Sequence, residues 1–166
     1  GGLALLATAG GRLVASTPAG PNAAGSASRD MTAPDLRLNL AGSRTFARLM
    51  TATPPDAAWE DETVAALLKL PAYVRRAMGS EQVGPTGERI TTNEDLAARL
   101  TLPLLVVTGA KDALSDGTAL AASYRARFPD AQVLTYAGSG HSPFAEAADR
   151  FNADLESFVV NATRTA

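Results

Sequence analysis

The sequence of 166 residues has no cysteine and only one histidine. Without cysteine there can be no disulfide, no thiolate-bound zinc and no cysteine nucleophile, and a single histidine excludes a metal site built from several imidazoles. The 15 basic and 17 acidic residues leave a net charge of −2, without a basic cluster. We therefore expect no nucleic-acid partner. Because no apolar run approaches about 18 residues, we also expect no membrane-spanning segment.

Hydrophobic residues make up 46% of the chain and charged residues 19%, which is typical of a globular protein with a buried core. The length suits one domain, or a core with one insertion. The chain opens with Gly1-Gly2, without a methionine, and passes directly into the apolar run of residues 3–8. No lysine or arginine precedes this run, so it lacks the pattern of a signal peptide. We expect a cytoplasmic protein and a chain that is a piece of a longer one.

Residues 3–8 (LALLAT) are short and apolar, and glycines flank the run, which predicts a strand of a parallel sheet. Residues 9–42 are rich in Ala, Gly, Ser and Pro, and we expect a mostly irregular connection there. Residues 43–79 have helical spacing. The predicted pieces are a short helix capped by Ser43, a second after Thr53-Pro54-Pro55-Asp56, and a third from Pro71 to Gly79. A loop over 80–93 and a short helix capped by Asn93 complete this region.

The last third of the chain is more regular. Apolar strands are predicted over 102–108 and 131–137, with a helix over 117–128 between them. A long amphipathic helix is predicted from Pro143 to about Val160, capped by Ser142, with Phe144, Ala148, Phe151, Leu155, Phe158 and Val159 on its apolar face. This strand–helix–strand–helix order is the βαβ pattern, so we expect an α/β fold with about three parallel strands.

Two chemically capable residues follow the ends of the last two strands. Gly109-Ala110-Lys111-Asp112 follows the first, and Gly138-Ser139-Gly140-His141 follows the second. Open α/β sheets bind ligands at the carboxyl ends of their strands, and neighbouring strands lie about 4.8 Å apart. We therefore expect Asp112 and His141 to meet. A carboxylate beside an imidazole fixes its tautomer and stabilises its protonated form, as in a catalytic base with its orienting acid.

The run LPLLVVTGAKD, followed by a helix, a strand and GSGHSPFAEAADRFNADLESFV, resembles the C-terminal part of the α/β-hydrolase fold. The stretches LPAYVRRAM and TTNEDLAARLTLP are similar to the end of the cap in haloperoxidase-like and esterase-like members, and LALLATAGG resembles the strand before that cap. The resemblance implies a partial hydrolase in three regions. These are a core strand in 1–10, a mostly helical cap or lid in 11–100 and the C-terminal core in 101–166. It also implies that Asp112 is the triad acid and His141 the triad base, in the family's order.

The family's nucleophile lies in a G-x-S-x-G elbow, and no such motif occurs in this sequence. We expect the nucleophile to lie upstream of residue 1, or Gly1-Gly2 to be the tail of the elbow. It would be Ser, or Asp as in the dehalogenase branch. Ser139 and Ser142 are not expected to be nucleophiles.

The resemblance implies a cofactor-free serine hydrolase that acts on small ester-like or other carbonyl substrates, inactive as this chain alone. The alternative is a non-catalytic relative that binds a ligand or a partner. Two further carboxylates receive structural interpretations. Asp116, a rival of Asp112 for the role of acid, is interpreted as a helix cap, and Glu146 as a structural residue near a helix N-terminus.

Overall fold

The computed structural model describes residues 3–6, 23–78 and 99–164. The chain divides into two compact units, each described by itself. The first, the sheet unit, contains the described residues 3–6, 50–52 and 99–164. The second, the helical unit, contains the described residues 23–49 and 53–78. The expected loop over 80–93 and the helix after Asn93 fall outside the described residues.

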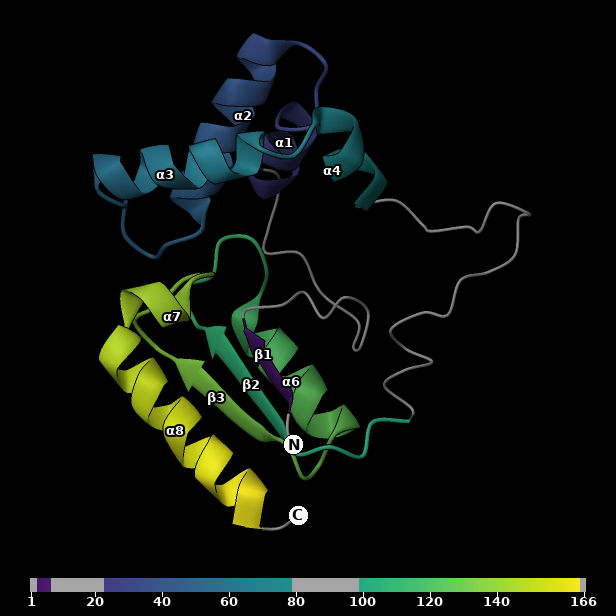
Figure 1. The fold of residues 1–166 in the computed structure, drawn as a ribbon, viewed down its shortest axis with the longest axis vertical. Coiled ribbons are helices and arrows are strands. Elements are labelled where there is room, and N and C mark those ends of the chain that lie inside the picture. Colours follow the sequence, from purple (N-terminus) through teal and green to yellow (C-terminus); the bar gives the residue numbers. More distant parts are fainter. Residues whose placement is uncertain (1–2, 7–22, 79–98, 165–166) are drawn as a thin grey trace, which may run out of the picture. The chain divides into compact units, whose positions relative to one another are not determined.

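The sheet unit contains three parallel strands in the order β1-β2-β3, as the sequence predicts (Figure 1). They are β1 (Leu3–Leu6), β2 (Leu104–Gly109) and β3 (Gln132–Tyr136). In the register, Leu3 lies opposite Leu104, and Val106 lies opposite Val133. Every residue of the central strand β2 is buried. A strand buried on both faces needs apolar side chains at successive positions, which explains the continuous run in the sequence.

Helices α6 (Gly117–Arg127) and α8 (Ala148–Arg164) cover opposite faces of this sheet. Successive side chains of a strand point to opposite faces. Accordingly, Leu105 and Val107 of β2 belong to a core cluster with Phe151 and Phe158 of α8, whereas Leu104 and Val106 pack with Leu120 and Tyr124 of α6. The predicted strand–helix–strand arrangement is therefore confirmed, and β2 is the common wall of two cores.

Tyr136, at the end of β3, adds a polar contact with α8. Its buried hydroxyl donates a 2.6 Å hydrogen bond to Asp154, and the guanidinium of Arg150 lies 3.9 Å from the centre of its ring. Burial, with a smaller effect of Asp154, raises the pKa of Tyr136 to about 12. The tyrosine therefore stays neutral and keeps donating its hydrogen bond at neutral pH.

The long helix predicted from Pro143 is in fact two helices, α7 (Pro143–Glu146) and α8. Ala147 leaves the helical conformation, with φ −138° and ψ 51°, so the helical phase is lost there. As a result Phe144 does not share the buried face. Within α8, Ala148 and Val159 are also exposed, so their predicted places on the apolar face are wrong. Ser142 occupies the N-cap position before Pro143, as predicted, and its carbonyl accepts the first bonds of α7, but its side chain makes no capping hydrogen bond.

The helical unit consists of α1 (Ala23–Asp30), α2 (Leu36–Leu49), α3 (Ala57–Leu68) and α4 (Ala72–Met78) (Figure 1). The irregular connection predicted over 9–42 is therefore wrong within its described part, where α1 and the start of α2 lie. A Cβ on Gly42 would come within 2.6 Å of the Asp30 carbonyl carbon, so the two helices touch backbone to backbone. Such contacts use small residues, which leave no apolar periodicity in the sequence.

The predicted capping role of Ser43 is also wrong. Ser43 lies in the interior of α2, is fully buried and accepts a 3.3 Å hydrogen bond from Arg75 of α4. The next two helices agree with the prediction. Asp56 caps α3 by accepting from the Trp59 N–H at 2.8 Å, and α4 follows Pro71.

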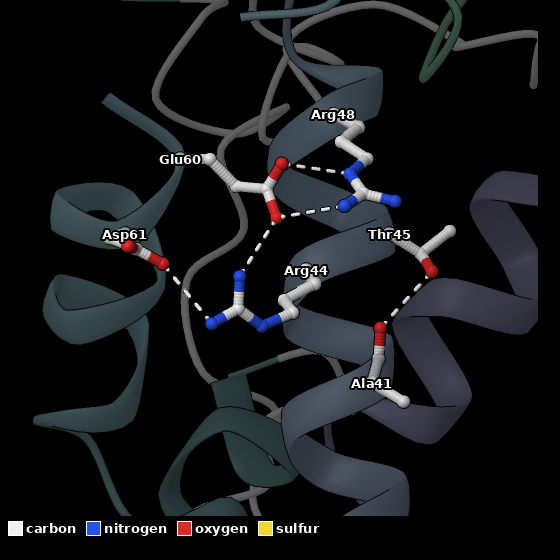
Figure 2. A network of polar contacts seen from close by, with 6 residues as sticks. All are labelled: Ala41, Arg44, Thr45, Arg48, Glu60 and Asp61. Carbon is white, nitrogen blue, oxygen red and sulfur yellow. Dashed lines mark hydrogen bonds and ion pairs between the residues drawn. The ribbon is translucent and has the colours of Figure 1, made fainter. Parts of the chain in front are cut away.

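A charged network joins α2 to α3 (Figure 2). The buried carboxylate of Glu60 accepts hydrogen bonds from Arg48 Nε at 2.8 Å and Arg44 Nη1 at 3.0 Å, and Arg44 Nη2 also contacts Asp61 at 3.1 Å. The Arg48 hydrogen bond is the largest of the influences that together lower the pKa of Glu60. Thr45 points away from the network and donates to the Ala41 carbonyl within α2. The network therefore lies on the side of α2 that packs against α3.

Candidate active site

The loop after β2 begins with main-chain bonds to the loop after β3. The Ala110 N–H donates to the Tyr136 carbonyl at 2.9 Å, and the Lys111 N–H donates to the Ser139 carbonyl at 3.0 Å. These bonds continue the parallel pairing beyond the strands themselves. They hold the two loops side by side at the carboxyl ends of β2 and β3, where the sequence places its two candidate site residues.

Asp112 is held by a tight turn of its own loop. Its Oδ1 accepts from the N–H groups of Leu114 at 2.8 Å and Ser115 at 3.1 Å, and its Oδ2 accepts from the Ser115 hydroxyl at 2.7 Å. The side chain of Asp112 has no exposed surface. A buried carboxylate is stable only when hydrogen bonds satisfy its oxygens, and here both oxygens are satisfied by residues two and three positions ahead.

Several influences act on the charge of Asp112. Burial, the largest single influence, raises the pKa of its carboxyl group. The hydrogen bond and charge of His141, together with the hydrogen bonds from Ser115 and Leu114, act in the opposite direction and outweigh it. The pKa of Asp112 therefore lies below its ordinary value, and the residue is an anion at neutral pH.

His141 follows β3 and meets Asp112 as the sequence predicts. Its Nδ1 lies 2.8 Å from Asp112 Oδ2, and 24% of its side chain is exposed. A carboxylate accepts but cannot donate, so it selects the neutral tautomer that carries the proton on Nδ1. The lone pair of Nε2 is then free to accept a proton. This is the arrangement of a general base with an orienting acid.

Glycines allow the two loops to approach this closely. A Cβ on Gly109 would overlap the carbonyl oxygens of Gly140 and Ser139, and a Cβ on Gly117 would overlap the carbonyl oxygen of Gly109. The backbone of Gly117, at the start of α6, therefore touches that of Gly109, and the backbone of Gly109 touches the loop after β3. Any side chain at Gly109 would push the His141 loop away from β2.

Asp116 lies four residues beyond Asp112 and plays the capping role expected of it. Its Oδ1 accepts from the N–H groups of Thr118 at 3.1 Å and Ala119 at 2.9 Å, at the start of α6. The structure thus separates the two carboxylates. Asp112 contacts the imidazole, and Asp116 begins a helix.

A family model described as "Alpha/beta hydrolase family" matches residues 1–154 of the sequence. The chain belongs to this family. No curated protein matches the chain. Three solved structures show the same fold.

A provisionally assigned aryl esterase from Burkholderia cenocepacia is 33% identical, with a TM-score of 0.69 over 83% of this chain and 48% of that one. The esterase RhEst1 from Rhodococcus sp. ECU1013 is 22% identical, with a TM-score of 0.71 over 97% of this chain and 56% of that one. The esterase EaEST from Exiguobacterium antarcticum is 16% identical, with a TM-score of 0.66 over 95% and 56%. The last two identities support the fold alone. The chain spans about half the length of these esterases.

Two serines flank the imidazole in this α/β hydrolase, and both are buried. The Ser139 carbonyl accepts from the Lys111 N–H, so its main chain joins the two loops. The Ser142 hydroxyl has no hydrogen-bond partner among the described residues. Within that same part of the chain, no three metal-ligating side chains come together, and no helix is both long and apolar enough to cross a bilayer.

Two residues of the site make contacts that the sequence does not predict, although Glu146 is expected to have a structural role near a helix N-terminus. Ser115 donates to the acid, and Glu146 accepts hydrogen bonds from two main-chain N–H groups that lie far apart in sequence. The spacing Asp-x-x-Ser was a usable signal for the first, because Asp and Ser form such turns locally. No local pattern indicates the second, because one of its partners lies 94 positions away.

Proposed function

We propose that this chain supplies the acid and the base of an esterase-like serine hydrolase. The observation that carries the proposal is the 2.8 Å contact between His141 Nδ1 and the buried Asp112 carboxylate. Asp112, an anion held by Ser115 and Leu114, orients the ring and stabilises its positive charge when it is protonated. Family membership and the match to a protein assigned as an aryl esterase support an ester as the substrate.

In this mechanism His141 Nε2 removes the proton of a serine hydroxyl as its oxygen attacks the ester carbonyl. The protonated ring then gives that proton to the alkoxide oxygen as its bond to the carbonyl carbon breaks, so an alcohol leaves and the acyl group stays on the serine. In the second half, His141 takes a proton from water as the water oxygen attacks the acyl carbon. The ring then returns the proton to the serine oxygen as the carboxylic acid is released. The nucleophile is proposed to lie in a part of the protein beyond these residues, because no G-x-S-x-G occurs in the sequence. The length of the matched esterases is consistent with this.

The helical unit is proposed to serve as the cap of the hydrolase. It lies in sequence between β1 and β2, and its exposed apolar side chains, such as Leu36 and Tyr73, offer surface that an apolar substrate could contact. A small-molecule substrate, the absence of a nucleic-acid or membrane partner and a cytoplasmic location remain part of the same proposal.

The test is labelling with a fluorophosphonate probe, with p-nitrophenyl ester turnover measured alongside. We expect no labelling of the 166-residue chain and stoichiometric labelling of a product that also includes the upstream coding sequence. In that longer product, His141→Ala should lower turnover by about 10⁶-fold and Asp112→Asn by about 10⁴-fold.

The matched control for Asp112→Asn is Asp130→Asn, which removes an exposed carboxylate and should leave turnover unchanged. A longer product that neither reacts with the probe nor turns over esters would favour the non-catalytic alternative. Labelling of the short chain that His141→Ala abolishes would place the nucleophile within these 166 residues and refute our assignment of its position.

A further inference from the structure

Glu146, the last residue of α7, binds two main-chain segments at once. Its Oε2 accepts from the Gly140 N–H at 2.6 Å, and its Oε1 accepts from the Ala52 N–H at 2.6 Å. Gly140 immediately precedes His141, and Ala52 belongs to the segment 50–52 of the sheet unit. We propose that Glu146 is a positioning residue that sets the place of His141 relative to Asp112. Its catalytic consequence rests on the function proposed above, but the positioning itself does not.

The two segments that Glu146 joins are already in backbone contact. A Cβ on Gly140 would come within 2.6 Å of the Ala52 nitrogen and 2.8 Å of the Thr51 carbonyl carbon. The N–H groups of residues 52 and 140 therefore lie close together, and a single carboxylate reaches both. Because a carboxylate has two acceptor oxygens and no donor, it can satisfy both groups with strong, charge-assisted hydrogen bonds.

The hydrogen bonds of Glu146 constrain the His141 loop, which the turn around Asp112 does not hold. The imidazole is carried by the loop after β3, and the Gly140 amide is bonded one residue before it. If the Gly140 peptide moves, the Cα of His141 moves with it, and the 2.8 Å contact with Asp112 lengthens. Misplacement of a reacting group by about 1 Å can cost about 10²-fold in rate, so a clamp on this peptide has a catalytic effect without touching substrate.

The substitution Glu146→Gln is the sharpest perturbation. It preserves side-chain length, keeps one acceptor oxygen and turns a donor amide toward one of the two N–H groups, which it repels. Glu156→Gln is the matched control. Glu156 is exposed on α8, so this substitution makes the same chemical change away from the His141 loop. Asp112→Asn supplies the reference state in which His141 has lost its carboxylate.

The experiment is nuclear magnetic resonance of the 166-residue chain, in which His141 gives the only imidazole signals. We expect the downfield Nδ1–H resonance to be present in the unaltered chain and in Glu156→Gln. It should be lost or strongly broadened in Glu146→Gln, as in Asp112→Asn, while most other amide signals remain in place. An Nδ1–H resonance in Glu146→Gln identical to that of the unaltered chain would overturn the proposal.

A second measurement decides the matter if Glu146→Gln does not fold. In the unaltered chain, a scalar coupling across each hydrogen bond should connect the amide nitrogens of Gly140 and Ala52 to the carboxyl carbon of Glu146. The absence of both couplings would refute the clamp.

Kinetics of the longer product separate the clamp from the proposed function. Glu146→Gln should lower kcat by about 10²-fold with little change in KM. If the unaltered longer product has no esterase activity, the proposed function fails, whereas the resonance measurement on the short chain still decides whether Glu146 positions His141.

Discussion

Two glycines at the site should respond in opposite directions to the same substitution. Gly109 ends β2 in a fully buried position, and Gly138 lies on the exposed turn after β3. A Cβ on Gly109 would overlap the carbonyl oxygens of Ser139 and Gly140, whereas a Cβ on Gly138 would have no heavy atom within 4 Å. Replacing each with alanine therefore tests whether close backbone approach holds the His141 loop against β2.

The magnitudes follow from what each methyl group meets. At Gly109 the obstacles are main-chain atoms, which cannot rotate aside. The substitution should therefore lower the free energy of unfolding by about 1–3 kcal/mol, the typical cost of overpacking a core. At Gly138 the alanine should stabilise by about 0.4–1 kcal/mol, because it restricts only the unfolded chain. The two variants should thus differ by about 1.4–4 kcal/mol, which corresponds to roughly 3–16 °C in melting temperature for a chain of this size.

The assay is urea unfolding followed by far-ultraviolet circular dichroism, with the His141 Nδ1–H resonance recorded on the same samples. We expect a lower midpoint and a perturbed resonance for Gly109→Ala, and an equal or higher midpoint with an unchanged resonance for Gly138→Ala. Equal midpoints for the two variants would refute the idea that the loops are held by direct backbone contact at Gly109.

Three further predictions concern charge and hydrogen bonding. Tyr136→Phe removes the 2.6 Å hydrogen bond to Asp154 and should lower the free energy of unfolding in urea by about 1–2 kcal/mol. The loss in the double variant with Asp154→Asn should be smaller than the sum of the two single losses, and full additivity would contradict this. The pKa of Asp112 lies below its ordinary value in the folded chain, so its stabilising contribution is present above the unfolded-state pKa and is lost as pH falls through the folded-state pKa. Asp112→Asn should therefore weaken the decrease in unfolding free energy at acidic pH. An unchanged slope of unfolding free energy against pH would refute this. Glu60→Gln should lower the melting temperature more than Glu62→Gln does, because Glu62 is exposed on α3, and this difference should shrink at high salt. Equal melting temperatures of the two variants would show that the network in Figure 2 contributes nothing measurable to stability.

The predictable part of the fold is the part whose signals are local and apolar. Strand β2 is buried on both faces, so its residues form an uninterrupted apolar run, and β3 follows after a helix with one apolar side. The rule that parallel strands share a carboxyl end then places Asp112 and His141 together without any knowledge of the packing. Their 2.8 Å contact is accordingly the feature of the site that the sequence predicts best.

The errors occur where packing uses backbone instead of large side chains. Helices α1 and α2 meet through Gly42, and the buried residues on these helices include Ala27, Ser43 and Ala47, so the apolar periodicity that predicts a helix is weak. The break at Ala147 is equally silent, because alanine is the best helix former and nothing in its neighbours marks the end of α7. The contact at Gly42 is tertiary, so nothing in the local sequence indicates it.

The two halves of the site differ in how their positions are determined. Three of the four hydrogen bonds to Asp112 come from residues two and three positions ahead, so its carboxylate is placed by the local turn. In the described structure no such turn holds the His141 side chain itself, and its loop is positioned by contacts with β2 at Gly109 and with Glu146 of α7. It follows that substitutions outside this loop should disturb the base before they disturb the acid. In an active enzyme such variants would retain an ionised Asp112 hydrogen-bonded to its own turn, and they would lose rate because the imidazole is misplaced.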